Sequence, residues 1–328
     1  MRFLVILLGT AALCAGNAVP KDNSHYIEGE SRYVWLSQDD DSLVLVDLHE
    51  RIETRTIDRN GANNQYWLYT RENPTNHQLL IKGNSNSVFS SNFRTNKPTS
   101  VIVHGWTNSG HHALNTVVRD ALLATQDCNV IVLDWSEAAA GSYVGAVRNV
   151  PGVGQSLGEF LTWLVGITGG SWDDLHLIGF SLGAHVVGGA GRAAAGSPAR
   201  VTGLDPAGPL WLTNSNKLTI SSGQYVEGIH TDGGRQGIFA PVGHSDFYPN
   251  GGRNLQPGCD GSSCSHARAY QFFASSIYTN RFIGRQCTSL SQAQNNECTG
   301  STLHMGNTIL TKQGSGLYGL STGSSWPF

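Results

Sequence analysis

The sequence has 328 residues, of which 39% are hydrophobic and 14% charged, and its formal net charge is −3. A nearly neutral chain without basic clusters or interleaved aromatic and basic residues is not expected to bind nucleic acid. Its weak charge also argues against electrostatic capture by anionic membranes. This length and composition suit one large α/β domain.

Residues 1–18 predict a secretory signal peptide. Met1 and Arg2 give a basic start, residues 3–8 form an apolar core, and small residues follow up to a cleavage site after Ala15 or Ala18. The apolar run is shorter than the ~20 residues that a membrane span needs, and no later run reaches that length. We therefore expect an exported, extracellular protein.

Residues 19–60 are polar, with one apolar run at 43–46, and predict an N-terminal extension of poorly defined structure. From residue 61 to 328, strand-like apolar runs alternate with stretches of helical spacing. Strands are predicted at 66–70, 99–103, 130–134, 175–180 and 201–204, and helices at 112–124, 153–165 and after Ser181. The first of these strands is expected at a sheet edge, and loops are expected in the Gly-, Ser- and Asn-rich last third. The alternation predicts a mostly parallel central sheet covered by helices on both faces.

The strand predicted at 175–180 runs into Gly179-Phe180-Ser181-Leu182-Gly183, and a helix-like run follows. Gly-x-Ser-x-Gly between a strand and a helix is typical of the nucleophile elbow of an α/β-hydrolase, which holds a serine hydroxyl above the sheet. The glycines remove side chains where strand and helix approach closely. The pentapeptide alone is weak evidence in a chain with 40 Gly. The assignment of Ser181 as a nucleophile therefore depends on finding a base and a carboxylate elsewhere in the chain.

Asp205 and His266 are the predicted partners of Ser181. Asp205 follows the strand at 201–204 and precedes a proline, although a simple turn before proline is the alternative. His230 and His244 also follow Asp205, so the chain order Ser, Asp, His alone does not choose the base. A neighbouring cysteine and a helix-like run at 267–277 favour His266.

A serine hydrolase also needs backbone N–H groups that stabilise the oxyanion. Leu182, directly after the nucleophile, is one predicted donor, and Trp106, in the glycine turn after the strand at 99–103, is the other. Two further histidines are given structural roles: His104 is expected to brace this turn, and His185 to be hydrogen bonded in the core.

Cysteine usage fits an oxidising compartment. Cys14 leaves with the signal peptide, and the pairs Cys259/Cys264 and Cys287/Cys298 are close enough in sequence to form two local loops. Zinc is the competing explanation for four cysteines, but neither pair has the C-x2-C spacing. The sixth cysteine, Cys128, is predicted to be a buried free thiol.

The chain resembles the pancreatic lipase family, particularly its single-domain insect members and the venom-type phospholipases A1. The matching motifs lie at 68–74, 103–106, 179–185, 203–209, 230–232, 246–252 and 264–266. The resemblance implies an α/β-hydrolase fold and ester hydrolysis on lipids without a cofactor. It implies the triad Ser181, Asp205 and His266, with the N–H groups of Trp106 and Leu182 as the oxyanion hole.

Departures from the family pattern are informative. The family's triglyceride lipases carry a long apolar lid between two cysteines, whereas Cys259 and Cys264 enclose only four polar or small residues, and the loop at 233–243 also looks short. Short loops resemble those of the family's phospholipases A1 and galactolipases. An open site with little interfacial activation is therefore expected, because no lid has to move.

The chain ends soon after a predicted closing strand within 314–322. We therefore expect no C-terminal β-sandwich and no colipase partner. The family's calcium region, at about 216–224, has too few carboxylates for a hard cation, so no metal is expected. The expected function is phospholipase A1 or galactolipase activity at a micelle or membrane interface. A neutral triacylglycerol lipase is the second hypothesis and a non-catalytic, yolk-protein-like lipid carrier the third; the sequence does not indicate an oligomeric state.

Overall fold

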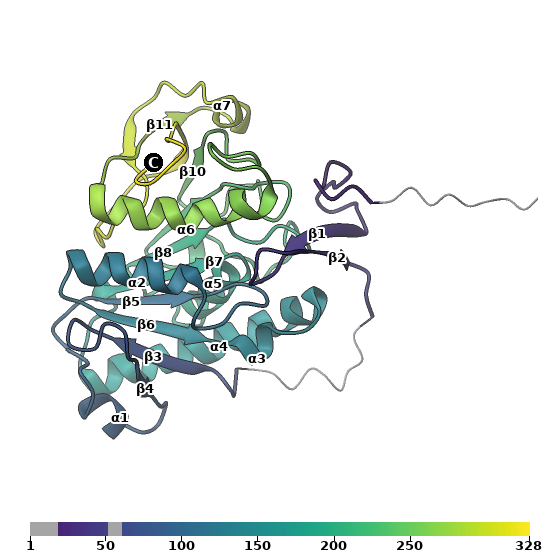
Figure 1. Cartoon of the computed structure of the whole chain (residues 1–328). Coiled ribbons are helices and arrows are strands. Elements are labelled where there is room, and N and C mark those ends of the chain that lie inside the picture. The colour runs from purple at the N-terminus through teal and green to yellow at the C-terminus, as the bar shows by residue number, and fades with distance from the viewer. Residues whose placement is uncertain (1–18, 52–60) are drawn as a thin grey trace, which may run out of the picture.

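A computed structural model describes residues 19–51 and 61–328, so the predicted signal peptide lies outside the described residues. An 11-stranded sheet runs through the molecule in the order β12-β11-β13-β10-β9-β8-β7-β5-β6-β3-β4 (Figure 1). Its strands are β3 (Gln65–Tyr69), β4 (Gln78–Leu80), β5 (Thr99–Val103), β6 (Asn129–Asp134), β7 (Leu175–Phe180), β8 (Arg200–Leu204), β9 (Tyr225–Ile229), β10 (Ser245–Pro249), β11 (Ile283–Cys287), β12 (Thr302–His304) and β13 (Gly316–Leu320). The strands from β6 to β13 in this order run parallel, and antiparallel strands flank them at both ends. The mostly parallel α/β-hydrolase sheet is confirmed.

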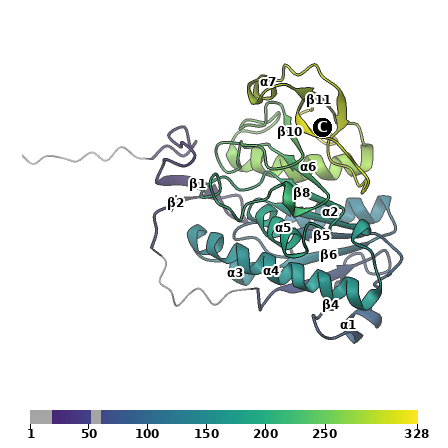
Figure 2. The ribbon, with the colours of Figure 1, turned by 180° about the vertical axis from the view of Figure 1, so that it is seen from behind.

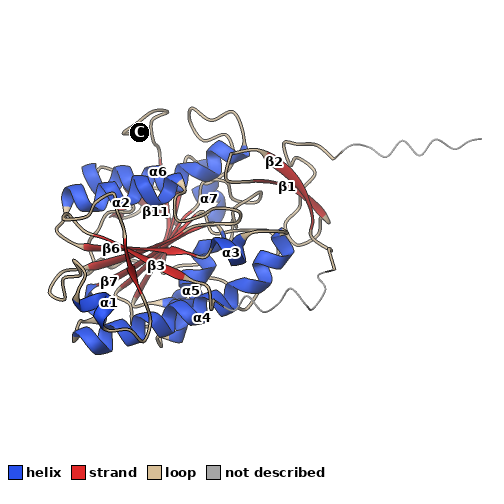
Figure 3. Cartoon of the chain, turned by 60° about the horizontal axis from the view of Figure 1, so that its bottom comes forward, coloured by secondary structure: helices blue, strands red, loops and turns tan. Residues whose placement is uncertain are grey.

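Helices cover both faces of the sheet, as predicted. Figure 3 shows α2 and α6 on one face and α4 and α5 on the other, and Figure 2 shows the second face from behind. The helices are α1 (Asn86–Phe89), α2 (Ala113–Thr125), α3 (Ser136–Ala139), α4 (Tyr143–Thr168), α5 (Leu182–Ala193), α6 (Ser262–Thr279) and α7 (Leu290–Asn295), with 3-10 turns η2 (Trp172–Asp174) and η3 (Ile220–Ser222). No helix within the described ranges is long and apolar enough to cross a membrane.

Helix α4 is longer than the predicted 153–165. It begins ten residues earlier, at Tyr143, and continues through Pro151. Its buried face already includes Tyr143, Val147 and Val150 before the proline. Packing of this apolar face outweighs the hydrogen bond that proline cannot donate within a helix.

Other differences concern sheet edges and the last third. The strand predicted at the edge, β3, is the second strand from that edge, because β4 pairs with its outer side. The closing strand β13 lies between β10 and β11. The last third holds β9 to β13 as well as the long helix α6, more regular structure than its loop-like composition suggested. These strands are short, and distant residues complete the sheet in which they pair, so their local sequence signals are weak.

The N-terminal extension also contains regular structure. Strands β1 (Tyr33–Ser37) and β2 (Leu43–Asp47) form an antiparallel hairpin that is separate from the 11-stranded sheet. One face of the hairpin buries Val34, Leu36 and Val46 in the core on the α4 and α5 side. In Figure 1 the hairpin lies beside the main body, at the end of the sheet where β7 meets α5.

Candidate active site

The turn between β7 and α5 has the geometry of a nucleophile elbow. Ser181 caps α5 with φ 56° and ψ −123°, a sparsely populated conformation that marks backbone strain. A Cβ at Gly179 would lie 2.2 Å from the carbonyl oxygen of Gly183, and one at Gly183 would lie 2.3 Å from that of Val103. The glycines therefore allow the close approach of strand and helix that the sequence predicted.

Asp205 and His266 meet beside this turn, although 61 positions separate them in the sequence. Asp205 follows β8, and its Oδ2 lies 2.6 Å from Nδ1 of His266 in the second turn of α6. The other carboxylate oxygen accepts the N–H groups of Thr231 at 2.7 Å and Asp232 at 3.0 Å. Because Asp205 only accepts, it assigns the imidazole proton to Nδ1 and leaves Nε2 as an acceptor.

Ser181 and His266 line the same pocket, together with aromatic side chains. Phe180 and Tyr270 are among the lining residues, and the rings of Phe180 and His266 lie 4.4 Å apart. The cavity has only about 30 Å³ of space for water-sized molecules. Ser181 and His266 thus share one narrow pocket, and Asp205 is linked to it through its bond to His266.

The turn after β5 lies against the nucleophile. A Cβ at Gly105 would be 2.9 Å from Cβ of Ser181, so the turn that carries Trp106 passes directly beside the serine. The N–H of Gly105 donates to Oδ1 of Asn108 at 3.3 Å, which fixes the turn. Leu182 is the first residue of α5, and the N–H groups of a helix's first turn have no intrahelical acceptor. Both predicted oxyanion donors therefore belong to backbone next to Ser181.

Two of the remaining histidines brace the structure as expected. His104 Nδ1 lies 3.0 Å from the carbonyl oxygen of Gly105, and its Nε2 accepts the N–H of Trp135 at 3.2 Å. His185 is fully buried, its Nε2 lies 2.9 Å from the carbonyl oxygen of Ala207, and burial lowers its pKa to about 3. Both rings therefore hold backbone groups in place around the site.

The two alternative bases, His230 and His244, form hydrogen bonds away from Ser181. His230 is fully buried, with Nε2 2.9 Å from Asp246 and Nδ1 2.8 Å from the carbonyl oxygen of Ile238. His244 accepts the N–H of Val226 at 3.0 Å, at the amino end of β9 and hence at the opposite edge of the sheet from Ser181. Both are fixed by bonds unrelated to the serine.

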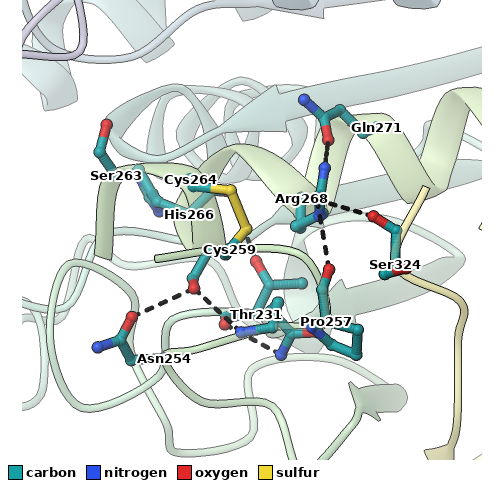
Figure 4. Close-up of a disulfide and its surroundings, with 12 residues drawn as sticks. Thr231, Asn254, Pro257, Cys259, Ser263, Cys264, His266, Arg268, Gln271 and Ser324 are labelled. Atoms are coloured by element: carbon teal, nitrogen blue, oxygen red, sulfur yellow. Dashed lines mark hydrogen bonds between the residues drawn. A yellow bond between two sulfur atoms is a disulfide. The ribbon is translucent and has the colours of Figure 1, made fainter. Parts of the chain in front are cut away.

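Both predicted disulfides are present. Cys259 and Cys264 are bonded across the start of α6, close to His266, and Cys287 is bonded to Cys298. Figure 4 shows the first disulfide beside Ser263 and His266. Cys128 is unpaired and buried, and burial raises the pKa of its thiol to about 12. Within the described ranges, no group of three or more His, Cys, Asp or Glu side chains could hold a metal ion.

Comparison with known proteins identifies the family. The family model described as Lipase matches residues 31–328. The chain belongs to the lipase family. The pancreatic triacylglycerol lipase of Myocastor coypus is 35% identical over 72% of this chain and 57% of its own length. The pancreatic lipase-related protein 2 of Rattus norvegicus is 34% identical over 71% of this chain and 56% of its own length.

This lipase-family chain thus spans a little over half the length of those relatives. Among solved structures, Est1E from Butyrivibrio proteoclasticus matches 35% of this chain and 43% of its own, at 15% identity and a TM-score of 0.26. The α/β-hydrolase architecture itself is seen in this chain's sheet order, its parallel central strands and the turn at Ser181.

Sequence reasoning gave no role to three residues of the candidate site. Asp232 is fully buried, and desolvation together with the nearby charge of Asp205 raises its pKa well above the usual range. Gln236 donates its side-chain N–H to Ser262 Oγ at 3.2 Å, and Gly237 lies so close that its Cβ would be 2.4 Å from Asp205. All three lie at or just after the 230–232 motif. A search of the loop that follows each strand's carboxyl end would have found them.

The pocket is narrower than the open site that the short loops predicted. Leu36, Ser37, Gln38 and Asp41, from the N-terminal hairpin, line it together with Ser181. The four-residue loop between Cys259 and Cys264 contributes only Ser263 to this lining, whereas the hairpin contributes four residues. Sequence gave no signal of this contribution, because the hairpin lies about 140 positions before Ser181.

Proposed function

We propose that the chain is a secreted serine esterase that hydrolyses acyl esters of glycerolipids. The observation that carries the proposal is the Asp205–His266 pair, 2.6 Å apart, in the pocket that the elbow serine lines. Membership of the lipase family supports the same chemistry. The two disulfides support an extracellular site of action.

In the proposed mechanism, Ser181 Oγ attacks the acyl carbonyl while Nε2 of His266 accepts its proton. Asp205 holds the imidazole in the required tautomer and stabilises the imidazolium. The N–H groups of Trp106 and Leu182 bind the oxyanion of the tetrahedral intermediate. The imidazolium then protonates the departing alcohol, and water, activated by the same base, releases the fatty acid from the acyl-enzyme.

Among glycerolipids, we place phospholipase A1 or galactolipase activity first. The short loop between Cys259 and Cys264 supports this order, because it encloses only four polar or small residues and forms no apolar lid of the triglyceride-lipase kind. A neutral triacylglycerol lipase is the alternative, supported by relatives that are named pancreatic triacylglycerol lipases. The proposal includes a micelle or membrane surface as partner, and neither a metal, a cofactor nor colipase.

A serine-reactive fluorophosphonate tests the esterase proposal directly. Labelling of the wild type, and none of Ser181→Ala, is the expected result. No labelling of pure, folded wild type, in buffer and with phosphatidylcholine vesicles alike, would instead favour a non-catalytic lipid carrier.

The proposed base can be tested with a matched histidine. His266→Ala should lose at least 10³-fold in kcat, since removing a triad member has roughly that effect. His244→Ala should keep near wild-type kcat, because His244 lies at the other edge of the sheet. The opposite pattern would assign the base to His244.

Substrate class is tested with phosphatidylcholine, a galactolipid and a triglyceride in matched micelles. We expect faster hydrolysis of one of the first two. Preference for the triglyceride would make the alternative correct.

A further inference from the structure

The hairpin β1–β2 covers the pocket through its tip, residues 38–42. The N–H of Asp39 donates to Thr107 Oγ1 at 3.1 Å, and Asn108 Nδ2 donates to Asp39 Oδ1 at 3.1 Å. On the opposite side, Ser263 Oγ donates to Asp41 Oδ1 at 3.0 Å. The tip therefore bridges the turn beside Trp106 and the loop enclosed by the first disulfide.

The end of β1 next to the tip is tied to the same site. Gln236 Oε1 accepts the N–H of Ser37 at 2.8 Å and its hydroxyl at 2.7 Å. The same Gln236 binds Ser262 at the start of α6, the helix that carries His266. Closure of the hairpin is thus linked by hydrogen bonds to the framework around the pocket.

With the hairpin in this position, the pocket beside the serine is too narrow for an acyl chain, although Ser181 itself is partly exposed. The cavity of about 30 Å³ has room for about one water molecule. Pockets that hold small organic ligands measure roughly 300–1,000 Å³. An acyl chain can therefore enter only after part of the wall has moved.

The tip of the hairpin is the most weakly held part of the wall, although the inner face of its two strands is packed in the core. The turn beside Trp106 packs against Ser181, and the Cys259–Cys264 loop is closed by a disulfide and continues into α6. The hairpin, in contrast, shares no strand pairing with the main sheet. Its tip is held by side-chain hydrogen bonds at partly exposed positions, which contribute little individually.

We propose that the β1–β2 hairpin, and not the loop between Cys259 and Cys264, is the movable cover of the active site, and that a lipid surface opens it. This inference rests on the proposed esterase function. Tyr33 and Leu45, on the outer face, are already 36% and 38% exposed. Opening also uncovers inner apolar side chains such as Leu36, and a lipid surface provides these with an apolar environment that water does not.

The first test weakens the closed state at the tip. Asp39→Ala with Asp41→Ala removes one side-chain hydrogen bond to each wall and leaves the bond from the N–H of Asp39 to Thr107. Asp40→Ala is a matched control, because the carboxylate of Asp40 accepts hydrogen bonds from Ser42 within the tip. Rates on a short-chain p-nitrophenyl ester are measured below and above its critical micelle concentration. Fluorophosphonate titration gives the concentration of active sites.

For the wild type and Asp40→Ala, we expect a sharp rise in rate at the critical micelle concentration. For the double variant, the rate on the monomeric ester should increase about five- to tenfold, because two charge-assisted hydrogen bonds of the closed state are lost. The rise at the micelle concentration should shrink accordingly. Equal rates for the double variant and the wild type on monomeric ester, or a wild type without the rise, would overturn the proposal.

A second measurement does not depend on catalysis. Hydrogen exchange at the amides of Ser37 and Asp39 is followed in Ser181→Ala, with and without phosphatidylcholine vesicles. Both amides donate to residues of the pocket wall in the closed state, so vesicles should accelerate their exchange. If the exchange rates of these two amides do not change when vesicles are bound, the hairpin is not a movable cover, even if the enzyme hydrolyses lipids. Accelerated exchange supports the cover even if the fluorophosphonate fails to label the wild type and the esterase proposal falls.

Discussion

Replacing Gly105 with alanine is a direct probe of the proposed oxyanion hole. The added Cβ would lie 2.9 Å from Cβ of Ser181 and 3.2 Å from Oδ1 of Asn108. Ser181 is fixed by the close approach of β7 and α5, so the turn that carries Trp106 has to retreat. It must move by about 0.5 Å or more to reach an ordinary carbon–carbon contact distance.

The expected effect follows from the role of that turn. Loss of one oxyanion donor costs on the order of 10²–10³ in kcat. Gly105→Ala shifts the N–H of Trp106 and does not remove it, so we expect a smaller decrease in kcat, of about 10- to 100-fold. KM should change little, because the oxyanion forms only after the substrate has bound.

The assay compares kcat and KM on a monomeric p-nitrophenyl ester, with thermal unfolding as a check on folding. Gly166→Ala in α4 is the matched control, because a Cβ at Gly166 meets no atom within 4 Å. This control should keep wild-type kcat, since alanine in a helix interior is tolerated or stabilising. A folded Gly105→Ala enzyme that keeps kcat within twofold of wild type would refute the assignment of the oxyanion hole to this turn.

Three further predictions concern stability and reactivity. Burial lowers the pKa of His112 from 6.5 to about 4, so the unfolded state takes up the proton first and stability is lost as pH falls from 6.5 towards 4. Between pH 7 and pH 5, the wild type should lose about 2 kcal/mol more unfolding free energy than His112→Asn, measured by urea denaturation at each pH. Glu227→Ala should lower the free energy of unfolding by about 3–5 kcal/mol, because it leaves the buried cations of Arg200 and Lys312 without their partner. Cys128 should not react with a thiol reagent in the native protein and should add one reactive thiol on denaturation, because it is buried with a raised pKa.

Each of these predictions has a contrary outcome. Parallel pH profiles for the wild type and His112→Asn would mean that the histidine is charged in the folded protein. A Glu227→Ala variant of wild-type stability would mean that the two cations find water or other acceptors. Fast labelling of native Cys128 would contradict its burial.

Local sequence was sufficient where a neighbour in the chain supplies the physical constraint. The elbow could be predicted because Gly179 and Gly183 flank Ser181, and both glycines avoid contacts of under 2.5 Å that a Cβ would make. The two disulfides could be predicted because short loops bring their cysteines together. The position of Asp205 could be predicted because a carboxylate that follows a parallel strand lies at the same sheet edge as the serine.

Only the tertiary structure decided which distant groups meet at that edge. The carboxylate of Asp205 and the imidazole of His266 come from β8 and α6, and the bonds of Asp39 and Asp41 across the pocket join segments 69 and 222 positions apart. Such contacts depend on how sheet and helices pack as a whole, and burial outweighs local propensity in short strands such as those of the hairpin. The sequence by itself therefore determined the fold class and the nucleophilic turn, whereas the narrow, covered pocket arose from packing between parts of the chain that carry no local sign of one another.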